Sequence, residues 1–283
     1  MKKLLNIGMD AETIPTQDEF KIQEFRTMAE SAKPSAPSMT KDEFGKYFGL
    51  DDKVVKAMTL EGLKQMWIDK NLAQAVEDKF EEIYRKTSFS AGEGGEIISL
   101  SVKTFYKKDD GEDLMIDPLT VSRYKDEEGN SECDMLKRIV NWFFSIDDYA
   151  KRFGMDLRFV GANVMGFDMR FIAQRCAING IEIPRGGFPW LASSYDRSRY
   201  FDVLDVWSFG DKTQRPSLDR LCKYLNVDTS KYDEMGKIDG SMVWPIWRDE
   251  GQEGAARIAR YNARDVIVLE PIFEKIKFFL GEV

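Results

Sequence analysis

Two acidic residues, Asp10 and Glu12, lie two positions apart at the end of the apolar run in "NIGMDAETIP", residues 6–15. Residues at i and i+2 of a β-strand point to the same face, so the two carboxylates would lie side by side. Like charges on a buried strand are costly unless they are protonated, paired or bound to a metal ion. In a chain with 49 acidic residues this spacing also arises by chance, and the strand could simply end at Asp10 with both acids in solvent.

Two later motifs bring further acids. In "ARYNARDV", Tyr261 and Asp265 are separated by four positions and share one face of a predicted helix. In "FVGANVMGFDMRFI", a predicted strand and loop lead to Asp168 at the start of another predicted helix. Each motif also has a structural explanation: Tyr261 could pack in the core while Asp265 pairs with Arg264, and Asp168 could be a helix cap or a first-turn acid.

Together these motifs supply four carboxylates and one phenol, from Asp10, Glu12, Asp168, Asp265 and Tyr261. A set of ligands made only of oxygen atoms suits hard cations such as Mg²⁺ or Mn²⁺ rather than zinc. Two such ions, about 3.5–4 Å apart, can hold both the attacking and the leaving oxygen of a phosphodiester displacement. The motifs therefore point to metal-dependent chemistry on phosphate esters.

The amino-acid composition excludes several kinds of active site. Histidine is absent, which excludes Ser-His-Asp and Cys-His triads, histidine general bases and His-ligated zinc. Only three cysteines occur in 283 residues, without metal-type spacing, as expected of free thiols in a reducing compartment. No apolar run approaches the ~18 residues of a membrane span, so we expect a cytoplasmic protein. The net charge of −8 argues against a broad basic surface for nucleic acid, but not against a site where bound cations supply the positive charge.

The first part of the chain contains a strand and a long helical region. We predict a first strand over residues 3–11 and a mostly helical insertion over residues 17–88, within a single domain that spans 1–283. The segment "ESAKPSAPSMTKDEF" is a linker that ends in a helix start, with Thr40 as the cap and Glu43 three residues later. The segment "LEGLKQMWIDKNLAQAVEDKFEEIYRK" has apolar residues near helical spacing and predicts one long helix or two in series.

Strands and helices alternate through the rest of the chain. "GGEIISLSVKTFYKKDDGEDLMIDPLTV" predicts a hairpin, and "DMLKRIVNWFFSIDDYAKRF" predicts a helix. "LRFVGAN" and "RYFDVLDVWSF" are predicted strands, separated by the helix "FDMRFIAQRCAING" and followed by the capped short helix "SLDRLCKYLNV". The last long helix contains Pro271, which we expect to kink or divide it. This order predicts an α/β fold with a mixed sheet.

The ordered set of motifs resembles the DnaQ-like, or DEDD, superfamily of 3′–5′ exonucleases. "DAETIP" resembles the first motif, "GANVMGFD" the second, and "YNARD" the third in the tyrosine form that defines the DEDDy branch. More narrowly, "KPSAPSMTKDEF", "GGEIISLSV", "YFDVLDVWSF" and "GKIDGSMVWPIW" are similar to predicted exonucleases related to the proofreading domain of family-B DNA polymerases. The resemblance implies an RNase H-like mixed five-stranded sheet flanked by helices, with the helical insertion after the first strand.

The resemblance also implies a role for each residue of the motifs. Asp10 would bridge two divalent cations, Mg²⁺ or Mn²⁺, and Glu12 and Asp265 would complete the site of the ion that activates water. Asp168 would hold the second ion beside the leaving 3′ oxygen. Tyr261 would orient the attacking water by a hydrogen bond, because a phenol with an ordinary pKa near 10 is a poor general base.

Substrate contacts are implied as well. Thr13 and Ile14 would approach the terminal nucleotide, Asn163 would contact the strand backbone, and Phe167 would pack beneath the site. Phe167 could equally belong to the core, and we favour the core. Three tryptophans could stack on bases, although packing within the protein is the more common role of such residues. They are Trp207, Trp244 and Trp247.

We therefore expect a metal-dependent 3′–5′ exonuclease that releases nucleoside 5′-monophosphates, with DNA favoured over RNA. Its partners would be single-stranded DNA 3′ ends and a polymerase or another replication or repair protein. The alternative is a non-catalytic module that binds nucleic acid or protein and retains the exonuclease fold. The acidic net charge favours this alternative slightly, whereas the intact set of acids favours the enzyme.

Overall fold

The structure is a computed structural model that describes residues 3–31, 34–106, 114, 117–124, 131–184, 198–229, 232–233 and 236–281. Contacts within the chain divide it into two compact units. One comprises Met1–Ile14 with Phe89–Val283, and the other comprises Pro15–Ser88. The second unit corresponds closely to the insertion predicted at 17–88. Among the described residues, no helix is both long enough and apolar enough to cross a membrane.

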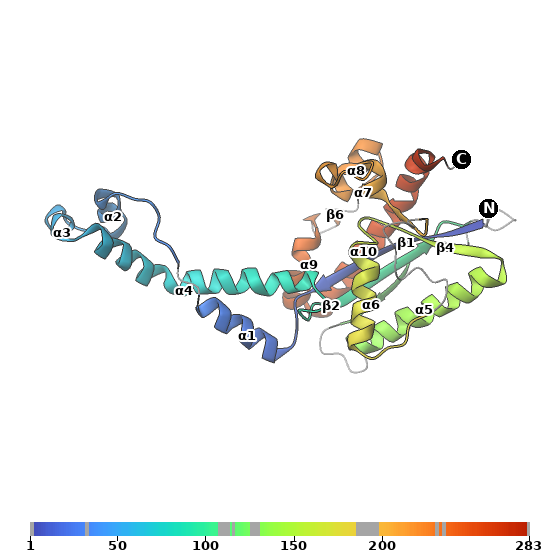
Figure 1. The fold of residues 1–283 in the computed structure, drawn as a ribbon, viewed down its shortest axis with the longest axis horizontal. Helices are drawn as coiled ribbons and strands as arrows, with labels where there is room; N and C mark the ends of the chain where they lie inside the picture. Colours follow the sequence, from blue (N-terminus) through green and yellow to red (C-terminus); the bar gives the residue numbers. More distant parts are fainter. Residues whose placement is uncertain are drawn as a thin grey trace. The chain divides into compact units, whose positions relative to one another are not determined.

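The first unit contains a mixed sheet of five strands and the helices that cover it (Figure 1). The strands of the sheet are β1 (Lys3–Ile14), β2 (Glu96–Thr104), β3 (Leu119–Ser122), β4 (Met155–Gly161) and β5 (Tyr200–Asp202). The main helices are α5 (Glu132–Arg152), α6 (Asp168–Ile178), α7 (Val203–Trp207), α8 (Leu218–Leu225), α9 (Gly240–Asp249) and α10 (Gly251–Ile276). Short pieces complete this unit: β6 (Tyr232–Asp233), β7 (Gly236–Lys237) and the 3₁₀ turns η2 (Lys212–Gln214) and η3 (Lys277–Leu280).

The strand order is β3-β2-β1-β4-β5. The first three strands of this order pair antiparallel, and β1, β4 and β5 pair parallel. This mixed five-stranded sheet confirms the predicted α/β class, and it is consistent with an RNase H-like fold. The longest strand, β1, therefore lies in the centre of the sheet, with β2 on one side and β4 on the other.

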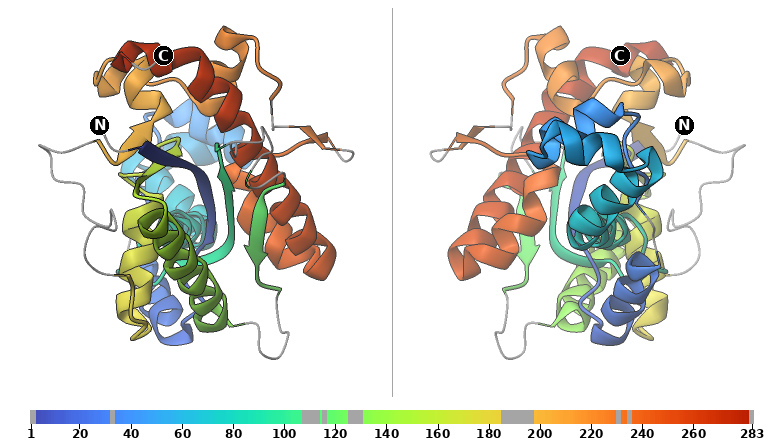
Figure 2. Two further views of the ribbon diagram at one scale, coloured as in Figure 1. Left: turned by 90° about the vertical axis from the view of Figure 1, so that its right-hand side faces the viewer. Right: turned by 90° about the vertical axis from the view of Figure 1, so that its left-hand side faces the viewer.

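Helices cover both faces of the sheet. Figure 2 shows α5 and α6 on one side of the strands and α10 on the other. On the α5 side, alternate residues of β1 such as Leu5, Ile7 and Met9 enter the largest apolar cluster. On the opposite side, α10 packs with α8 in one cluster and with α9 in another. The residues of β1 between those apolar positions consequently face α10.

All the regular elements among the described residues of the second unit are helices, which confirms the helical insertion after the first strand. Its helices are α1 (Glu19–Glu30), α2 (Lys41–Phe48), α3 (Asp52–Ala57) and α4 (Leu60–Lys86), followed by the 3₁₀ turn η1 (Thr87–Phe89). The segment that could have formed one helix or two is the single helix α4. In Figure 1, α1 lies along one part of α4, and α2 and α3 lie at its other end. Arg26 of α1 forms an ion pair of 3.0 Å with Glu77 of α4, which joins α1 to α4.

Local capping signals are confirmed. Thr40 and Glu43 form a reciprocal capping box at the start of α2. Ser217 accepts a hydrogen bond from the backbone N–H of Arg220 at the start of α8. Gly180 follows α6 with φ of 64°, a conformation that favours glycine after a helix.

Three expectations about element boundaries are wrong. The first strand does not end at residue 11 but continues to Ile14, with a register shift between Glu12 and Thr13. The strand predicted over "RYFDVLDVWSF" stops at Asp202, because this side chain accepts hydrogen bonds from the N–H groups of Leu204 and Asp205 and so caps α7. The turn predicted within "KKDDGED" lies outside the described residues.

The third concerns Pro271, for which we expected a kink or a division of the last helix: the division is wrong, and the kink stays a prediction. The helix runs from Gly251 to Ile276 with Pro271 inside it. Proline removes one helical hydrogen bond, but Leu269 and Ile272 on either side are buried in the same apolar cluster. Burial of this face on both sides of the proline keeps the helix continuous.

Candidate metal centre

The central strand places Asp10 and Glu12 on the face of the sheet that α10 covers. Their neighbours Met9 and Ala11 belong to the apolar cluster on the opposite face. Asp10 lies opposite Ser101 of β2, and Glu12 lies opposite Ser99, within the antiparallel ladder. Because the strand continues past both acids, neither is at a solvated strand end.

Helix α10 brings Asp265 to the same place. Asp10, Glu12 and Asp265 each offer a carboxylate oxygen, and these oxygens lie within 4.8 Å of one another. Asp265 is 4% exposed. The sequence motifs at the two ends of the chain thus meet at one acidic cluster, and a single cation could contact all three carboxylates.

Tyr261 lies one turn before Asp265 on α10 and is 2% exposed. Its ring packs in the apolar cluster that contains Ile14, Ile258 and Trp247. Its hydroxyl group forms a hydrogen bond with Asp265. The ring is therefore part of the core, as the structural explanation predicted, and the hydroxyl contacts the acidic cluster, whereas its role towards water stays a prediction.

Asp168 is the first residue of α6, and its side chain is buried at 3% exposure. The backbone N–H of Ala11 donates a hydrogen bond to Oδ1 of Asp168, with a distance of 3.0 Å. Since Ala11 lies between the two acids of β1, this bond places Asp168 beside the cluster. Asp168 is a first-turn acid, as the structural explanation predicted, and its charge also acts on the carboxyl of Asp10.

Several negative charges lie close together in this acidic cluster, and they shift the pKa of its members. Burial is the largest cause that raises the pKa of the Asp10 carboxyl well above its ordinary value, and Asp265 is the next. The charges of Glu12 and Asp168 raise the pKa of Asp10 further, while a hydrogen bond from Asn262 lowers it.

The same environment acts on Asp168 and Tyr261. Burial raises the pKa of Asp168 to about 7, even though backbone N–H donors such as that of Ala11 favour its charged form. Burial also raises the pKa of Tyr261 above its ordinary value, and the nearby carboxylates, with Glu12 first among them, raise it further. The phenol is therefore a hydrogen-bond donor and not a base at neutral pH.

These properties fit divalent cations. The candidate ligands are all carboxylate oxygens, which Mg²⁺ and Mn²⁺ prefer. The raised pKa values of Asp10 and Asp168 show that the protein alone leaves much of this negative charge uncompensated. A bound cation would favour the charged form of each acid.

The structure reveals one further residue at the cluster, Asn262, which the sequence analysis did not single out. Its Nδ2 atom donates to Oδ2 of Asp10 at 2.6 Å and to the backbone oxygen of Asp10 at 3.0 Å. Asn262 lies within the "YNARD" motif, three positions before Asp265 and thus on the same side of the helix. A polar residue on the buried face of a helix was the signal that could have identified it.

The residues expected to contact substrate occupy different environments. Thr13 follows the register shift at the end of β1, whereas the side chain of Ile14 is fully buried in the cluster that contains Tyr261. Asn163 has φ of 67° in the turn between β4 and α6, and its Oδ1 accepts a hydrogen bond from Arg215 at 3.5 Å. A Cβ at Gly166 would lie 2.4 Å from Oδ1 of Asn163, so a larger residue there would displace that side chain.

The aromatic residues pack mainly against one another. Phe167 contacts Phe171 with ring centroids 5.3 Å apart, as expected for a residue packed against the core. Trp207 stacks on Tyr224 at 6.0 Å. Trp244 and Trp247 stack at 5.9 Å, and Trp247 is only 2% exposed.

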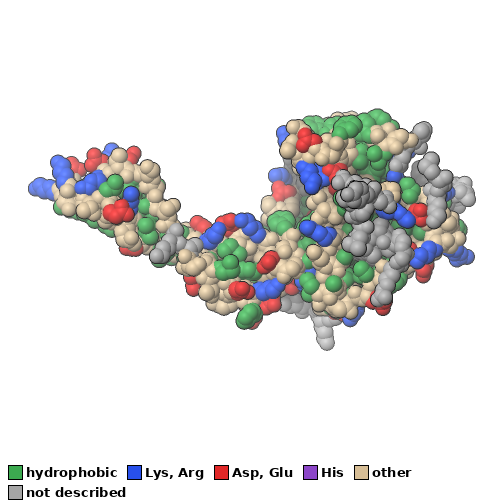
Figure 3. Space-filling view, viewed as in Figure 1, with side chains coloured by type: hydrophobic (Ala, Val, Ile, Leu, Met, Phe, Trp, Pro, Cys, Tyr) green, Lys and Arg blue, Asp and Glu red, His purple; other side chains and the backbone are tan. Residues whose placement is uncertain are grey.

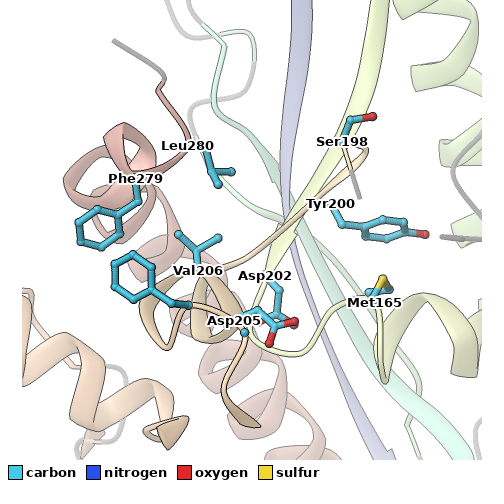
Figure 4. Close-up of a pocket in the computed structure, with 10 residues that line it drawn as sticks. Met165, Ser198, Tyr200, Asp202, Asp205, Val206, Phe279 and Leu280 are labelled. Atoms are coloured by element: carbon cyan, nitrogen blue, oxygen red, sulfur yellow. Dashed lines mark hydrogen bonds between the residues drawn. The ribbon is translucent and has the colours of Figure 1, made fainter. Parts of the chain in front are cut away.

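A pocket of about 470 Å³ lies near the carboxyl end of β5 (Figure 4). Figure 4 shows Asp202 and Asp205 close together on one wall, with Phe279 and Leu280 across from them. Both acids have partners, because Asp202 caps α7 and Asp205 forms an ion pair with Arg215. The charge of Asp202 also raises the pKa of Asp168, so these two acids interact. Its polar wall stabilises the junction between β5 and α7, and we assign it no ligand.

Comparison with known proteins adds no family assignment: no family model matches the sequence, and no curated protein matches it.

Proposed function

We propose that this chain is a metal-dependent exonuclease that hydrolyses phosphodiester bonds at the 3′ end of nucleic acid, with DNA favoured over RNA. One observation carries the proposal. Acids from three distant segments, represented by Asp10, Asp168 and Asp265, gather with Glu12 at one place on the central strand. These are the same residues that the resemblance to DnaQ-like exonucleases implies as ligands. Their oxygen-only chemistry supports Mg²⁺ or Mn²⁺ as the cofactor.

Asp10, Glu12, Asp168 and Asp265 would hold two divalent cations, which would activate water and offset the charge that develops on the phosphodiester group. Charged side chains of both signs are interspersed on the face drawn in Figure 3. This distribution supports a substrate site whose positive charge is supplied locally rather than by a broad basic surface.

Tyr261 would act by orienting water. Its raised pKa keeps the hydroxyl protonated, so it cannot remove a proton from water at neutral pH. The hydrogen bond with Asp265 fixes the position of the hydroxyl at the edge of the acidic cluster. Orientation by such a group lowers the entropic part of the barrier.

The test is a gel time course with 5′-labelled single-stranded DNA and RNA in the presence of Mn²⁺, Mg²⁺ or EDTA. We expect a ladder that shortens from the 3′ end only with a divalent cation, and we expect circular single-stranded DNA to remain intact. Asp10→Asn should abolish the ladder. Asp147→Asn is the matched control, because Asp147 is a buried acid on α5 that pairs with Lys151.

Failure of the wild-type protein to shorten either polymer would overturn the proposal. Retention of single-stranded DNA without cleavage, measured by fluorescence anisotropy, would then favour the non-catalytic binding module.

A further inference from the structure

Asn262 connects the acidic cluster to the edge of the sheet through a chain of hydrogen bonds. Its side chain is completely buried. Besides its two bonds to Asp10, its Oδ1 accepts a hydrogen bond of 3.0 Å from Oγ of Ser99 on β2. Ser99 in turn lies 3.2 Å from Oγ of Ser122 on β3. Four residues on four elements thus form one connected polar path through the sheet face that α10 covers.

The direction of this path follows from counting protons. Ser99 has a single hydroxyl proton, and it is donated to Asn262. Ser122 must therefore donate to Ser99 rather than accept from it. Every donor points toward Asp10, so the amide of Asn262 cannot turn over without placing its oxygen against the oxygens of Asp10.

The bonds to Asp10 constrain its side chain in a specific way. One amide group holds both the backbone oxygen and Oδ2 of Asp10, which ties the carboxylate to its own main chain. Oδ1 of Asp10 takes no part in this contact. The carboxylate therefore has a defined orientation before any ligand arrives, on the same face of β1 as Glu12 and beside Asp265.

We propose that Asn262 is a positioning residue that orients Asp10 for cation binding, and that Ser99 holds the amide of Asn262 in the required direction. This inference rests on the proposed metal-dependent function. Groups that orient metal ligands act on affinity, and their loss costs about 10- to 100-fold in affinity or activity. A purely structural role for Asn262 would change stability but not the affinity for a cation.

The experiment measures Mn²⁺ binding to the full chain by titration calorimetry, without nucleic acid. We expect Asn262→Ala to raise the Mn²⁺ dissociation constant about 10- to 100-fold and Ser99→Ala to raise it by a smaller factor. Ser101→Ala is the matched control. Ser101 lies on β2 and is as buried as Ser99. It forms a hydrogen bond of 2.8 Å with Thr120 of β3, just as Ser99 forms one with Ser122 of β3.

Thermal melts of the same proteins separate positioning from folding. We expect Ser99→Ala and Ser101→Ala to lower the melting temperature by similar amounts, while only Ser99→Ala weakens Mn²⁺ binding. Equal dissociation constants for the wild type and Asn262→Ala would overturn the inference. If Asn262→Ala does not fold, equal constants for Ser99→Ala and Ser101→Ala would overturn it instead.

The gel assay distinguishes this inference from the proposed function. A wild-type protein that binds Mn²⁺ but leaves 3′ ends intact would overturn the exonuclease, and the dissociation constants of the variants would still decide the role of Asn262. A wild type that cleaves, with variants that bind Mn²⁺ as it does, would overturn only the inference.

Discussion

The backbone N–H of Ala11 and the carboxylate of Asp168 are joined by a hydrogen bond of 3.0 Å across 157 positions of sequence. Ala11 lies between Asp10 and Glu12 on the central strand, so this bond fixes the start of α6 against the segment that carries both acids. Asp168 is consequently buried near Asp10, and its charge raises the pKa of the Asp10 carboxyl.

Asp10→Asn should abolish turnover and should not destabilise the metal-free protein. Asparagine keeps an oxygen that can accept the hydrogen bond from Asn262, and it removes a buried charge whose pKa is raised by its surroundings. We expect an unchanged or higher melting temperature in EDTA at pH 8, because the variant removes this charge repulsion. A marked loss of thermal stability in differential scanning calorimetry would contradict the assignment of Asp10 to a repulsive cluster.

The stability of the metal-free protein should fall as the pH rises from about 4 to about 7. Asp168 has an ordinary pKa of 3.8 and a folded-state pKa of about 7, so the folded state binds the proton more tightly between these values. The stabilising contribution of this proton is fully present below the unfolded-state pKa of 3.8. It is lost as the pH rises through the folded-state pKa of about 7. Asp10 contributes with the same sign. The free energy of unfolding that Asp168 contributes in this way is on the order of 4 kcal/mol at most.

Urea unfolding in EDTA at pH 5 and pH 8 measures this effect, and Asp168→Asn isolates it. Acids with lowered pKa values, such as Glu82 at about 2, finish titrating below this range. The variant should lose less stability than the wild type between the two pH values, and Mn²⁺ should restore the wild type at pH 8. An equal loss in both proteins would rule out Asp168 as the group responsible.

Tyr261→Phe should slow turnover by about 10- to 100-fold, because orientation of water contributes to the rate without supplying a base. The phenylalanine ring fills the same position in the apolar cluster, so we expect little change in stability. Mn²⁺ affinity should also stay close to that of the wild type. Single-turnover rates at saturating Mn²⁺ provide the measurement, and an unaltered rate would remove Tyr261 from the mechanism.

The sheet should fold without the helical unit. The two ends of this unit lie together, since the N–H of Thr16 donates to Oγ1 of Thr87 at 2.9 Å. In addition, Ile14 at the end of β1 pairs with Glu96 at the start of β2. Replacing residues 17–86 by a short Gly/Ser linker therefore leaves a loop that can connect the two strands.

We expect this shortened chain to unfold cooperatively and to retain near-ultraviolet circular dichroism. The same linker placed between Asp156 and Leu157, inside β4, is a control that should prevent folding. A shortened chain that binds a hydrophobic dye and melts without a cooperative transition would show that the sheet depends on the helical unit.

Much of the fold was predictable because its signals are local. The period of two along β1 placed Asp10 and Glu12 on one face, and the spacing of four placed Tyr261 and Asp265 on one face of α10. Caps such as Thr40 and Ser217 marked helix starts because their partners lie within three residues. These relations depend only on backbone geometry, which short stretches of sequence specify.

The boundaries that were predicted wrongly failed for two different reasons. Pro271 remains inside α10 because the apolar residues around it are buried together, and burial is a property of the assembled core. The strand β5 ends at Asp202 because that side chain caps a helix rather than continuing the ladder. At Pro271 a local preference yields to packing that exists only after the chain has folded. The Asp202 cap is instead a local signal, with partners two and three positions away, that the strand prediction overlooked.

The sequence by itself determined the types of candidate ligands, their order and the faces of the elements that carry them. Only the tertiary structure decided that the acids meet, that Ala11 binds Asp168, and that Asn262 holds Asp10 across 252 positions. Contacts between such distant residues depend on strand order and helix packing, which many weak interactions fix together. No short segment contains that information, and the orientation of Asp10 is therefore a property of the folded sheet.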